Sequence, residues 1–199
     1  MGSTLSDRDY VPDRVSQSVK IVVLGSFGVG KTTYVRAVSE IRSMHTEEAM
    51  TQAGEAIDDL SGVRDKTTTT VTMDFGRLTL TTDLVLYLFG APGQDRFLPM
   101  VTQLMDGALG ALVLVDTRRL DQSFTSIDLV ERAGLPYAIA VNTFPDAPTY
   151  ADTEIRDSLT MENSTPLVRI DARVRDSAKR ALIALISNML GRPHLETAP

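Results

Sequence analysis

The chain has 199 residues, of which 43% are apolar and 23% are charged, as is ordinary for a single soluble globular domain with a substantial core. The formal net charge of −6 argues against nucleic-acid binding through a basic surface. The absence of cysteine excludes disulfides, thiolate metal sites, prenylation and palmitoylation. The sequence has no apolar run of membrane-spanning length and no apolar signal-peptide core, so we expect a cytoplasmic protein that binds no nucleic acid.

The first predicted element is a buried parallel strand at Val19–Leu24, because this run is short, apolar and rich in β-branched residues. A glycine-rich turn follows it, and residues 31 to about 42 are expected to form a helix. The turn has phosphate-loop spacing, in which a glycine, four further residues and Gly-Lys-Thr join a strand to a helix. The residues expected to bind nucleotide phosphates are Gly25, Ser26, Phe27, Gly28, Val29, Gly30, Lys31, Thr32 and Thr33.

The chemistry of this loop follows from its backbone. A helix N-terminus has unpaired N–H groups and a partial positive charge, and both favour phosphate. Gly28 and Gly30 let the backbone curl so that successive N–H groups point inward. Lys31 is expected to reach the β- and γ-phosphates, and the Thr32 hydroxyl is expected to bind Mg²⁺.

The next segments connect the loop to the centre of the chain. Residues 43–66 are polar and acidic, and we predict a long mobile connection there, with a short helix at about Glu47–Ala53. Alternation at 71–82 and an apolar run at 84–89 predict an antiparallel hairpin that turns near Thr82 and Asp83. The Gly90–Asp95 segment breaks the second strand, and a short helix is expected at Pro99–Met105.

Beyond residue 109 the pattern alternates as in parallel α/β units. Strands are predicted at 110–115, 137–141 and 167–170, and helices at 122–133 and 151–159. A final helix has apolar side chains at three- and four-residue steps from Ala178 to Met189, and it ends at Gly191 and Pro193.

Together these elements predict an α/β fold in three layers. We expect a mostly parallel six-stranded sheet, with one antiparallel strand and helices on both faces. The domain is expected to span residues 19–193, between a flexible tail at 1–18 and a second tail at 194–199.

Four further segments resemble the nucleotide-contacting motifs of Ras-like small GTPases. Thr70–Phe75 resembles the switch I threonine and the strand after it in Rab-like proteins, and Gly90–Gln94 resembles the switch II motif Asp-Thr-Ala-Gly-Gln. Asn142–Asp146 lies where Asn-Lys-x-Asp reads guanine, and Asp171–Arg173 resembles the Ser-Ala-Lys loop. Among these GTPases the chain is most similar to the bacterial gliding-motility and conservon types, and it shares the run Lys66–Gly76 with the conservon type.

The resemblance implies a P-loop G domain that binds GTP and GDP with Mg²⁺ and acts as a slow GTPase switch in a bacterial signalling complex. Thr70 would bind Mg²⁺ and the γ-phosphate, Gly93 would donate its N–H to the γ-phosphate, and Gln94 would orient the attacking water. Lys31, Thr70 and Gln94 would be the catalytic residues, and Thr32 and Thr70 the metal ligands. Two loops would hold the guanine base through Asn142, Thr143, Asp146, Asp171, Ala172 and Arg173.

Three positions depart from the family pattern. Gly90 stands where most small GTPases have the aspartate that holds the Mg²⁺ shell, so either the metal binds more weakly or another carboxylate, with Asp74 as our candidate, replaces it. One extra residue precedes Asp146 and the base-covering lysine is absent, so guanine preference is less secure than phosphate binding. Phe27 stands at a glycine position of Ras, where it would crowd Gln94 and an incoming arginine unless its ring turns away.

Other functions remain open at this point. A nucleotide-binding scaffold with little or no hydrolysis is supported by Gly90, whereas a small-molecule kinase would usually carry an arginine-rich lid that this sequence lacks. If hydrolysis uses an internal arginine, Arg64 and Arg96 are the candidates. By resemblance, the partners would be a roadblock-type regulatory protein and a sensor-kinase-like protein, through which the chain would reach the inner face of the membrane.

Overall fold

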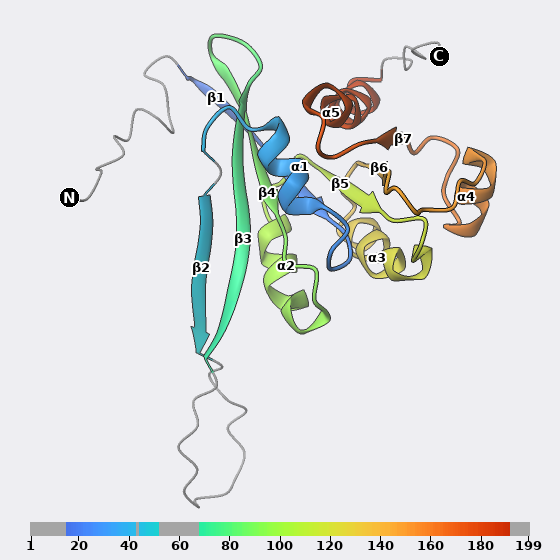
Figure 1. Ribbon diagram of the computed structural model, residues 1–199. Helices are drawn as coiled ribbons and strands as arrows, with labels where there is room; N and C mark the ends of the chain where they lie inside the picture. The colour runs from blue at the N-terminus through green and yellow to red at the C-terminus, as the bar shows by residue number, and fades with distance from the viewer. Residues whose placement is uncertain (1–14, 43, 52–67, 192–199) are drawn as a thin grey trace, which may run out of the picture.

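The computed structural model describes residues 15–42, 44–51 and 68–191, which form one sheet with helices on both faces (Figure 1). The strands are β1 (Gln17–Leu24), β2 (Met44–Thr51), β3 (Thr68–Thr79), β4 (Leu84–Gly90), β5 (Gly110–Val115), β6 (Tyr137–Asn142) and β7 (Leu167–Ile170). The helices are α1 (Lys31–Val38), α2 (Leu98–Met105), α3 (Phe124–Arg132), α4 (Asp152–Ser158) and α5 (Arg175–Met189), with 3₁₀ turns η2 (Asp95–Phe97) and η3 (Leu120–Ser123).

The strand order across the sheet is β2-β3-β4-β1-β5-β6-β7. β3 is antiparallel to both of its neighbours, and the other pairs are parallel. The predicted α/β class and the mostly parallel six-stranded sheet with one antiparallel strand are therefore confirmed, and β2 adds a seventh strand at the β3 edge. Strands that alternate with helices come back parallel, so the chain reverses direction only where β3 pairs directly with β2 and with β4.

The short helix predicted at Glu47–Ala53 is wrong. Residues 44–51 instead form β2, which pairs with β3 from Met44 opposite Phe75 to Thr51 opposite Thr68. Backbone pairing along the long β3 strand outweighs the local helix preference of this polar run, as tertiary context often does. The rest of the predicted mobile connection, residues 52–67, lies outside the described residues.

The first helix ends at Val38, four residues before the predicted end. Ser39 stops it, because its side chain hydroxyl donates to the Ile41 carbonyl at 2.9 Å and accepts from the Arg77 N–H at 3.2 Å. A serine that bonds to nearby backbone competes with continuation of a helix. The same bonds attach the end of α1 to β3.

Two apolar layers fill the space between the sheet and its helices. On one face, buried residues of β1, β4, β5 and β6 pack against α1 and α5, where the predicted stripe of the last helix is buried at Ala178, Ala181, Leu182 and Leu185. On the other face, alternate residues of β1, β5 and β6 pack against α2, α3 and α4. The predicted three-layer arrangement is confirmed.

The topology gathers five strand ends at one edge of the sheet. β1 lies in the middle, and its two neighbours, β4 and β5, are reached by connections on opposite sides, which makes the end of β1 a topological switch point. The segments after Leu24, Gly90, Val115, Asn142 and Ile170 all leave from this edge. β1 begins at Gln17, inside the predicted tail, while residues 1–14 and 192–199 lie outside the described residues.

Candidate nucleotide-binding site

The phosphate loop leaves the carboxyl end of β1 and turns directly into α1. Gly30 is the N-cap of α1 and has a φ of 105°, which glycine adopts without the steric penalty of a side chain. A Cβ at this position would lie 2.6 Å from Nδ2 of Asn142, so the close approach of Asn142 also requires glycine. No side chain of the described residues caps the start of α1, which leaves its first N–H groups open to a phosphate.

Lys31 folds back under this loop. Its Nζ donates to the carbonyl oxygens of Gly25 and Ser26, at 2.6 and 2.8 Å. An ammonium group has three N–H donors, so one remains for a phosphate oxygen. Burial lowers the pKa of Lys31 to about 8, and the nearby Asp74 carboxylate opposes that shift. A bound phosphate would favour the charged form of the lysine.

Thr32 and Asp74 form the second polar pair of the site. The Thr32 hydroxyl donates at 2.5 Å to Oδ2 of Asp74, a buried carboxylate on β3. Both groups are hard oxygen donors of the kind that Mg²⁺ prefers. In the part of the chain that the structure describes, no three His, Cys, Asp or Glu residues gather as a metal site, so an ion here would also need phosphate oxygens or water.

These residues line a cavity of about 380 Å³ over the start of α1. Gly93 crosses the mouth of the cavity, where a Cβ would lie 2.8 Å from the backbone nitrogen of Phe27. Only glycine lets the segment after β4 approach the phosphate loop this closely. The lining residues are Phe27, Gly28, Gly30, Lys31, Thr32, Thr33, Asp74, Ala91, Pro92, Gly93, Gln94, Arg96 and Phe97.

The structure brings together most of the residues predicted to handle the phosphates. Gln94 and Arg96 line the cavity with the phosphate loop, and the Arg96 guanidinium lies 4.8 Å from the centroid of the Phe97 ring. Thr70 lies within β3, opposite Ala49 of β2, and four residues from Asp74. At about 3.3 Å per residue it is about 13 Å from Asp74 along the strand, so its role as a Mg²⁺ ligand requires the start of β3 to rearrange and stays a prediction. Arg64 lies outside the described residues.

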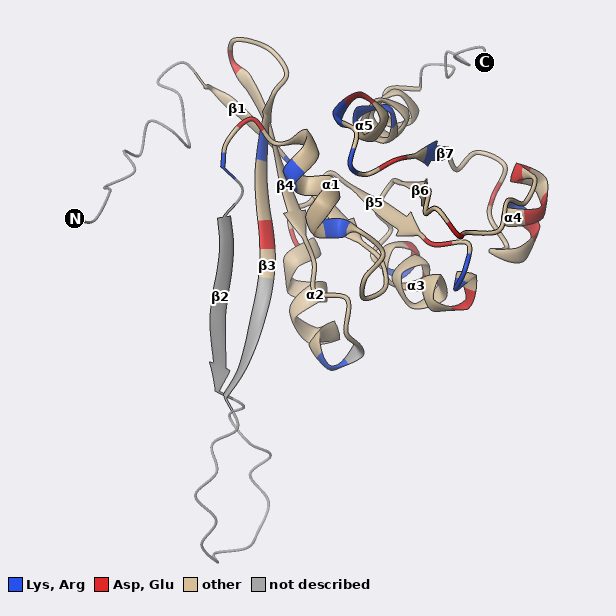
Figure 2. Ribbon diagram, in the orientation of Figure 1, with Lys and Arg blue, Asp and Glu red and all other residues tan. Residues whose placement is uncertain are grey.

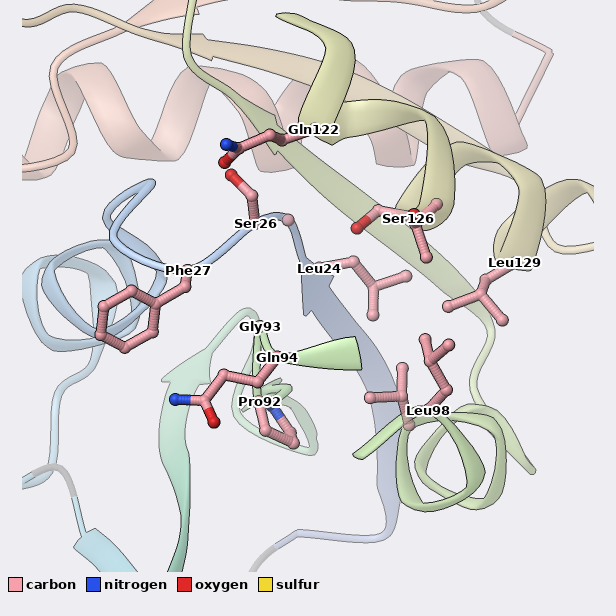
Figure 3. Close-up of a pocket in the computed structure, with 13 residues that line it drawn as sticks. Leu24, Ser26, Phe27, Pro92, Gly93, Gln94, Leu98, Gln122, Ser126 and Leu129 are labelled. Carbon is pink, nitrogen blue, oxygen red and sulfur yellow. The ribbon is translucent and has the colours of Figure 1, made fainter. Parts of the chain in front are cut away.

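Phe27 stands between this cavity and a second one of about 330 Å³, bounded by the phosphate loop, α2 and α3. The Phe27 side chain is 67% exposed. Figure 3 shows its ring and the Gln94 amide directed to the same side, away from Leu98 and Leu129. The ring is therefore not packed on a neighbouring loop, and it lies on the side of the site to which Gln94 points.

Asn142 connects the phosphate loop to the loop after β7. Its Nδ2 donates to the Val29 carbonyl at 2.9 Å, and its Oδ1 accepts from the Ala172 N–H at 3.0 Å. Asn142 thus joins the phosphate loop to the loop after β7, and its contact with the guanine base stays a prediction. Ala172 was predicted to hold the guanine base, and its N–H, which donates to Asn142 here, would have to share or exchange that bond to do so.

The remaining predicted base contacts surround this bridge. Asp146 is exposed in a turn that is closed by the Ala147 N–H and the Phe144 carbonyl at 3.2 Å, and Thr143 is exposed just before it. Arg173 pairs with Asp171 at 2.7 Å, and its hydrogen bonds lower the pKa of Asp171 to about 2. Asp171 and Arg173 thus bind each other at the surface, and the carboxylate of Asp146 is open to solvent.

One group of residues at this edge escaped sequence reasoning. Asp116 follows β5 and is buried, and it binds Arg118 at 2.7 Å and Arg119 at 3.4 Å. Acidic and basic residues lie close together in the segment that connects β5 to α3 (Figure 2). The sequence does contain a signal for this cluster: an aspartate directly after a fully apolar strand, with two arginines close behind it. A carboxylate at the end of a buried strand needs cationic partners, and the arginines could supply them.

Comparisons with known proteins give a family and a fold for the chain. The family described as "conserved hypothetical ATP binding protein" matches residues 23–192. An uncharacterized protein of Methanocaldococcus jannaschii is 33% identical over 126 residues, which are 62% of this chain and 69% of the relative. The crystal structure of the G domain of the T. maritima FeoB iron transporter superposes with a TM-score of 0.60 at 16% identity, over 86% of this chain and 98% of that domain.

The structural likeness establishes a G-domain-like fold. Over the described part of the chain, no helix combines the length and the apolar character that crossing a bilayer requires. The family match extends from the end of β1 past α5 and includes the phosphate loop. The chain is a nucleotide-binding P-loop protein, and it belongs to the family of conserved hypothetical ATP binding proteins.

Proposed function

We propose that this protein is a switch that binds GTP and GDP with Mg²⁺ and hydrolyses GTP slowly. The observation that carries the proposal is that Lys31, Thr32 and Asp74 line one cavity whose mouth is crossed by Gly93. A phosphate-binding helix N-terminus, a cation and hard oxygen donors are the parts that phosphoryl transfer from a nucleotide requires.

Each part has a distinct task. The backbone N–H groups at the start of α1 and the free donor of Lys31 would bind the phosphate oxygens. Thr32 would bind the metal ion directly, and Asp74 would hold the water molecules around it. The bound ion would stabilise the negative charge of the transferring phosphoryl group. Gln94 lies on the same cavity and would orient the attacking water.

The position of Gly93 supports a switch rather than a rigid site. Its backbone lies against Phe27 N at the mouth over Lys31, where a third phosphate would have to fit. We infer that the segment 91–94 moves outward when a triphosphate binds and relaxes after hydrolysis, as an order-changing switch does. Partner proteins would read this difference, and by resemblance a roadblock-type protein and a sensor-kinase-like protein are the partners we propose.

ATP is the second candidate nucleotide, because the family description names ATP. Guanine is favoured by the exposed Asp146, since guanine N1–H and its 2-amino group are two donors that adenine does not offer together. Competition between GTP and ATP at equal concentration tests the choice, with Asp146→Asn as the partner variant. GTP should win on the wild type, and xanthine nucleotides should gain on Asp146→Asn. Equal binding of ATP would reject the guanine assignment.

The alternative function is a scaffold that binds nucleotide without hydrolysing it. Measuring phosphate release distinguishes this scaffold from a GTPase. Wild-type protein loaded with GTP and Mg²⁺ should release phosphate slowly, without an added acceptor molecule. Tight nucleotide binding with no phosphate release would assign the scaffold role instead.

A further inference from the structure

A buried carboxylate at the end of β5 holds two consecutive arginines. The side chain of Asp116 is fully buried, and it accepts from Arg118 Nε at 2.9 Å and from Arg118 Nη2 at 2.7 Å. Burial alone would raise the pKa of Asp116, but the hydrogen bonds from Arg118 keep it below the ordinary value. Asp116 is therefore a fixed negative charge at the edge of the sheet where the phosphate loop begins.

Arg119 extends from this anchor to the phosphate loop. Its Nη2 lies 3.4 Å from Oδ2 of Asp116 and 3.4 Å from the carbonyl oxygen of Phe27. The same nitrogen would lie 3.7 Å from a Cβ on Gly28, so the guanidinium follows the tip of the loop without a clash. One planar cation thus bridges a buried carboxylate and the backbone of the loop.

The contact lies on the outer face of the loop. A phosphate loop turns its N–H groups inward to the anion and its carbonyl groups outward. Arg119 meets the loop at the Phe27 carbonyl and is not among the residues that line the phosphate cavity, so we assign it no direct contact with a phosphate. Its effect on a nucleotide has to pass through the shape of the loop.

The loop needs such a support at its tip. Lys31 binds the carbonyls of Gly25 and Ser26, and Asn142 binds the carbonyl of Val29, so both ends of the loop are held. Between them, the Phe27 ring is 67% exposed and Gly28 has a φ of 77°. Glycine loses much conformational freedom on ordering, and an exposed ring provides no packing anchor.

We propose that Arg119 is a positioning residue that, anchored by Asp116, holds the tip of the phosphate loop in its binding conformation. This rests on the proposed function, because it assumes that the loop binds nucleotide phosphates. Loss of the guanidinium should loosen the tip, raise the KM and the nucleotide dissociation rate, and leave kcat almost unchanged.

The experiment compares the wild type with Arg119→Gln, Arg119→Lys and Arg132→Gln, using fluorescently labelled GDP for dissociation and GTP for KM and kcat. Arg132→Gln is the matched control, because Arg132 lies on α3 in an exposed pair with Asp128 and loses the same charge. Arg119→Gln should speed GDP dissociation about five- to tenfold. Arg119→Lys should recover most of that loss, and Arg132→Gln should stay within about twofold of the wild type.

The outcomes separate the inference from the proposed function. Dissociation from Arg119→Gln within about twofold of the wild type, or an equal effect of Arg132→Gln, would overturn the positioning role. So would a fall in kcat as large as the fall in kcat/KM. If Arg119→Gln does not fold, Arg119→Lys decides, because it should fold and bind nearly as the wild type does. A wild-type protein that binds no nucleotide would reject the proposed function instead.

Discussion

Asp74 of β3 and Gly90 of β4 are directly paired, and the side chain of Asp74 fills the space that a side chain at position 90 would need. A Cβ on Gly90 would lie 3.0 Å from Cβ of Asp74 and 3.2 Å from its Oδ2. Each position can therefore carry a carboxylate into the site only if the other stays small. The aspartate missing at Gly90 has a counterpart on the neighbouring strand, where it already binds Thr32.

The first prediction concerns that carboxylate. Asp74→Asn should weaken the Mg²⁺ dependence of GTP binding by about 10–100-fold, the usual effect of losing a group that orients metal ligands. The neutral amide keeps the size of the side chain but loses the charge that attracts the ion. Titration of labelled GTP over a range of Mg²⁺ concentrations measures it.

The control for Asp74 exchanges the two positions. Gly90→Asp alone should destabilise the fold by about 1–3 kcal/mol, because it overpacks the space beside Asp74. The double variant Asp74→Gly with Gly90→Asp should recover much of the Mg²⁺ dependence that Asp74→Asn loses. If Asp74→Asn binds GTP and Mg²⁺ as the wild type does, the carboxylate has only a structural task.

The second prediction concerns Lys31. Lys31→Ala should remove at least about 1.5–3 kcal/mol of triphosphate binding, the worth of a charge-assisted hydrogen bond. The fold should survive, because the lost bonds go to carbonyls of the loop and not to the apolar core. Titration calorimetry with a non-hydrolysable GTP analogue measures the loss, and circular dichroism verifies the fold. Unchanged affinity would remove the phosphate-loop assignment.

The third prediction is the pH dependence that follows from the lowered pKa of Lys31, about 8 in the protein without nucleotide. Phosphate favours the charged lysine, so binding raises this pKa and takes up a proton wherever the free lysine is partly neutral. The affinity for nucleotide should therefore be nearly constant below pH 8 and fall as the pH rises above it.

The stability of the fold should depend on pH in the opposite direction, because burial disfavours the charged form of Lys31 in the folded protein. Stability should rise with pH between about 8 and the ordinary value of 10.5.

Calorimetry at pH 7.5 to 9.5 in buffers of different ionisation enthalpy measures the proton uptake on binding. Lys31→Arg is the control, because arginine stays charged over this range and should show no uptake. Equal uptake by both proteins would assign the proton to another group.

The sequence predicted the parts of this structure that depend on local patterns. β5 and β7 begin and end where their apolar runs do, and the phosphate loop was recognisable from the spacing of Gly25, Gly30 and Lys31. Asn142 was proposed from the resemblance of Asn142–Asp146 to a guanine-reading motif, and in the structure it follows a buried strand that ends at the same edge as β1. These features are set by a few neighbouring residues, or by the rule that parallel strands share an edge.

The missed features depend on contacts between distant segments. Residues 44–51 read as part of a polar connection, and only pairing with β3 makes them a strand. Ser39 ends α1 through bonds to Ile41 and to Arg77, the second of which belongs to another strand. The role of Arg119 depends on Asp116 and on the Phe27 carbonyl, a backbone atom that no residue pattern can reveal.

The final prediction concerns the rate of hydrolysis. The exposed Phe27 ring lies on the side to which the Gln94 amide points, so we expect it to crowd Gln94 and the attacking water over the γ-phosphate (Figure 3). Restraining a mobile side chain costs about 0.5–1.5 kcal/mol, which is about two- to tenfold in rate. Phe27→Gly should speed single-turnover GTP hydrolysis by that factor.

Gln94→Leu should slow single-turnover GTP hydrolysis at least about tenfold, because the amide that positions the water is lost. The wild type should turn over at about 10⁻⁴–10⁻³ s⁻¹ without a partner, the scale of a small G protein that lacks a catalytic arginine. A fast wild type that Phe27→Gly leaves unchanged would refute the crowding by the ring. Full activity of Gln94→Leu would exclude Gln94 from the reaction and direct attention to Arg96, which lines the same cavity.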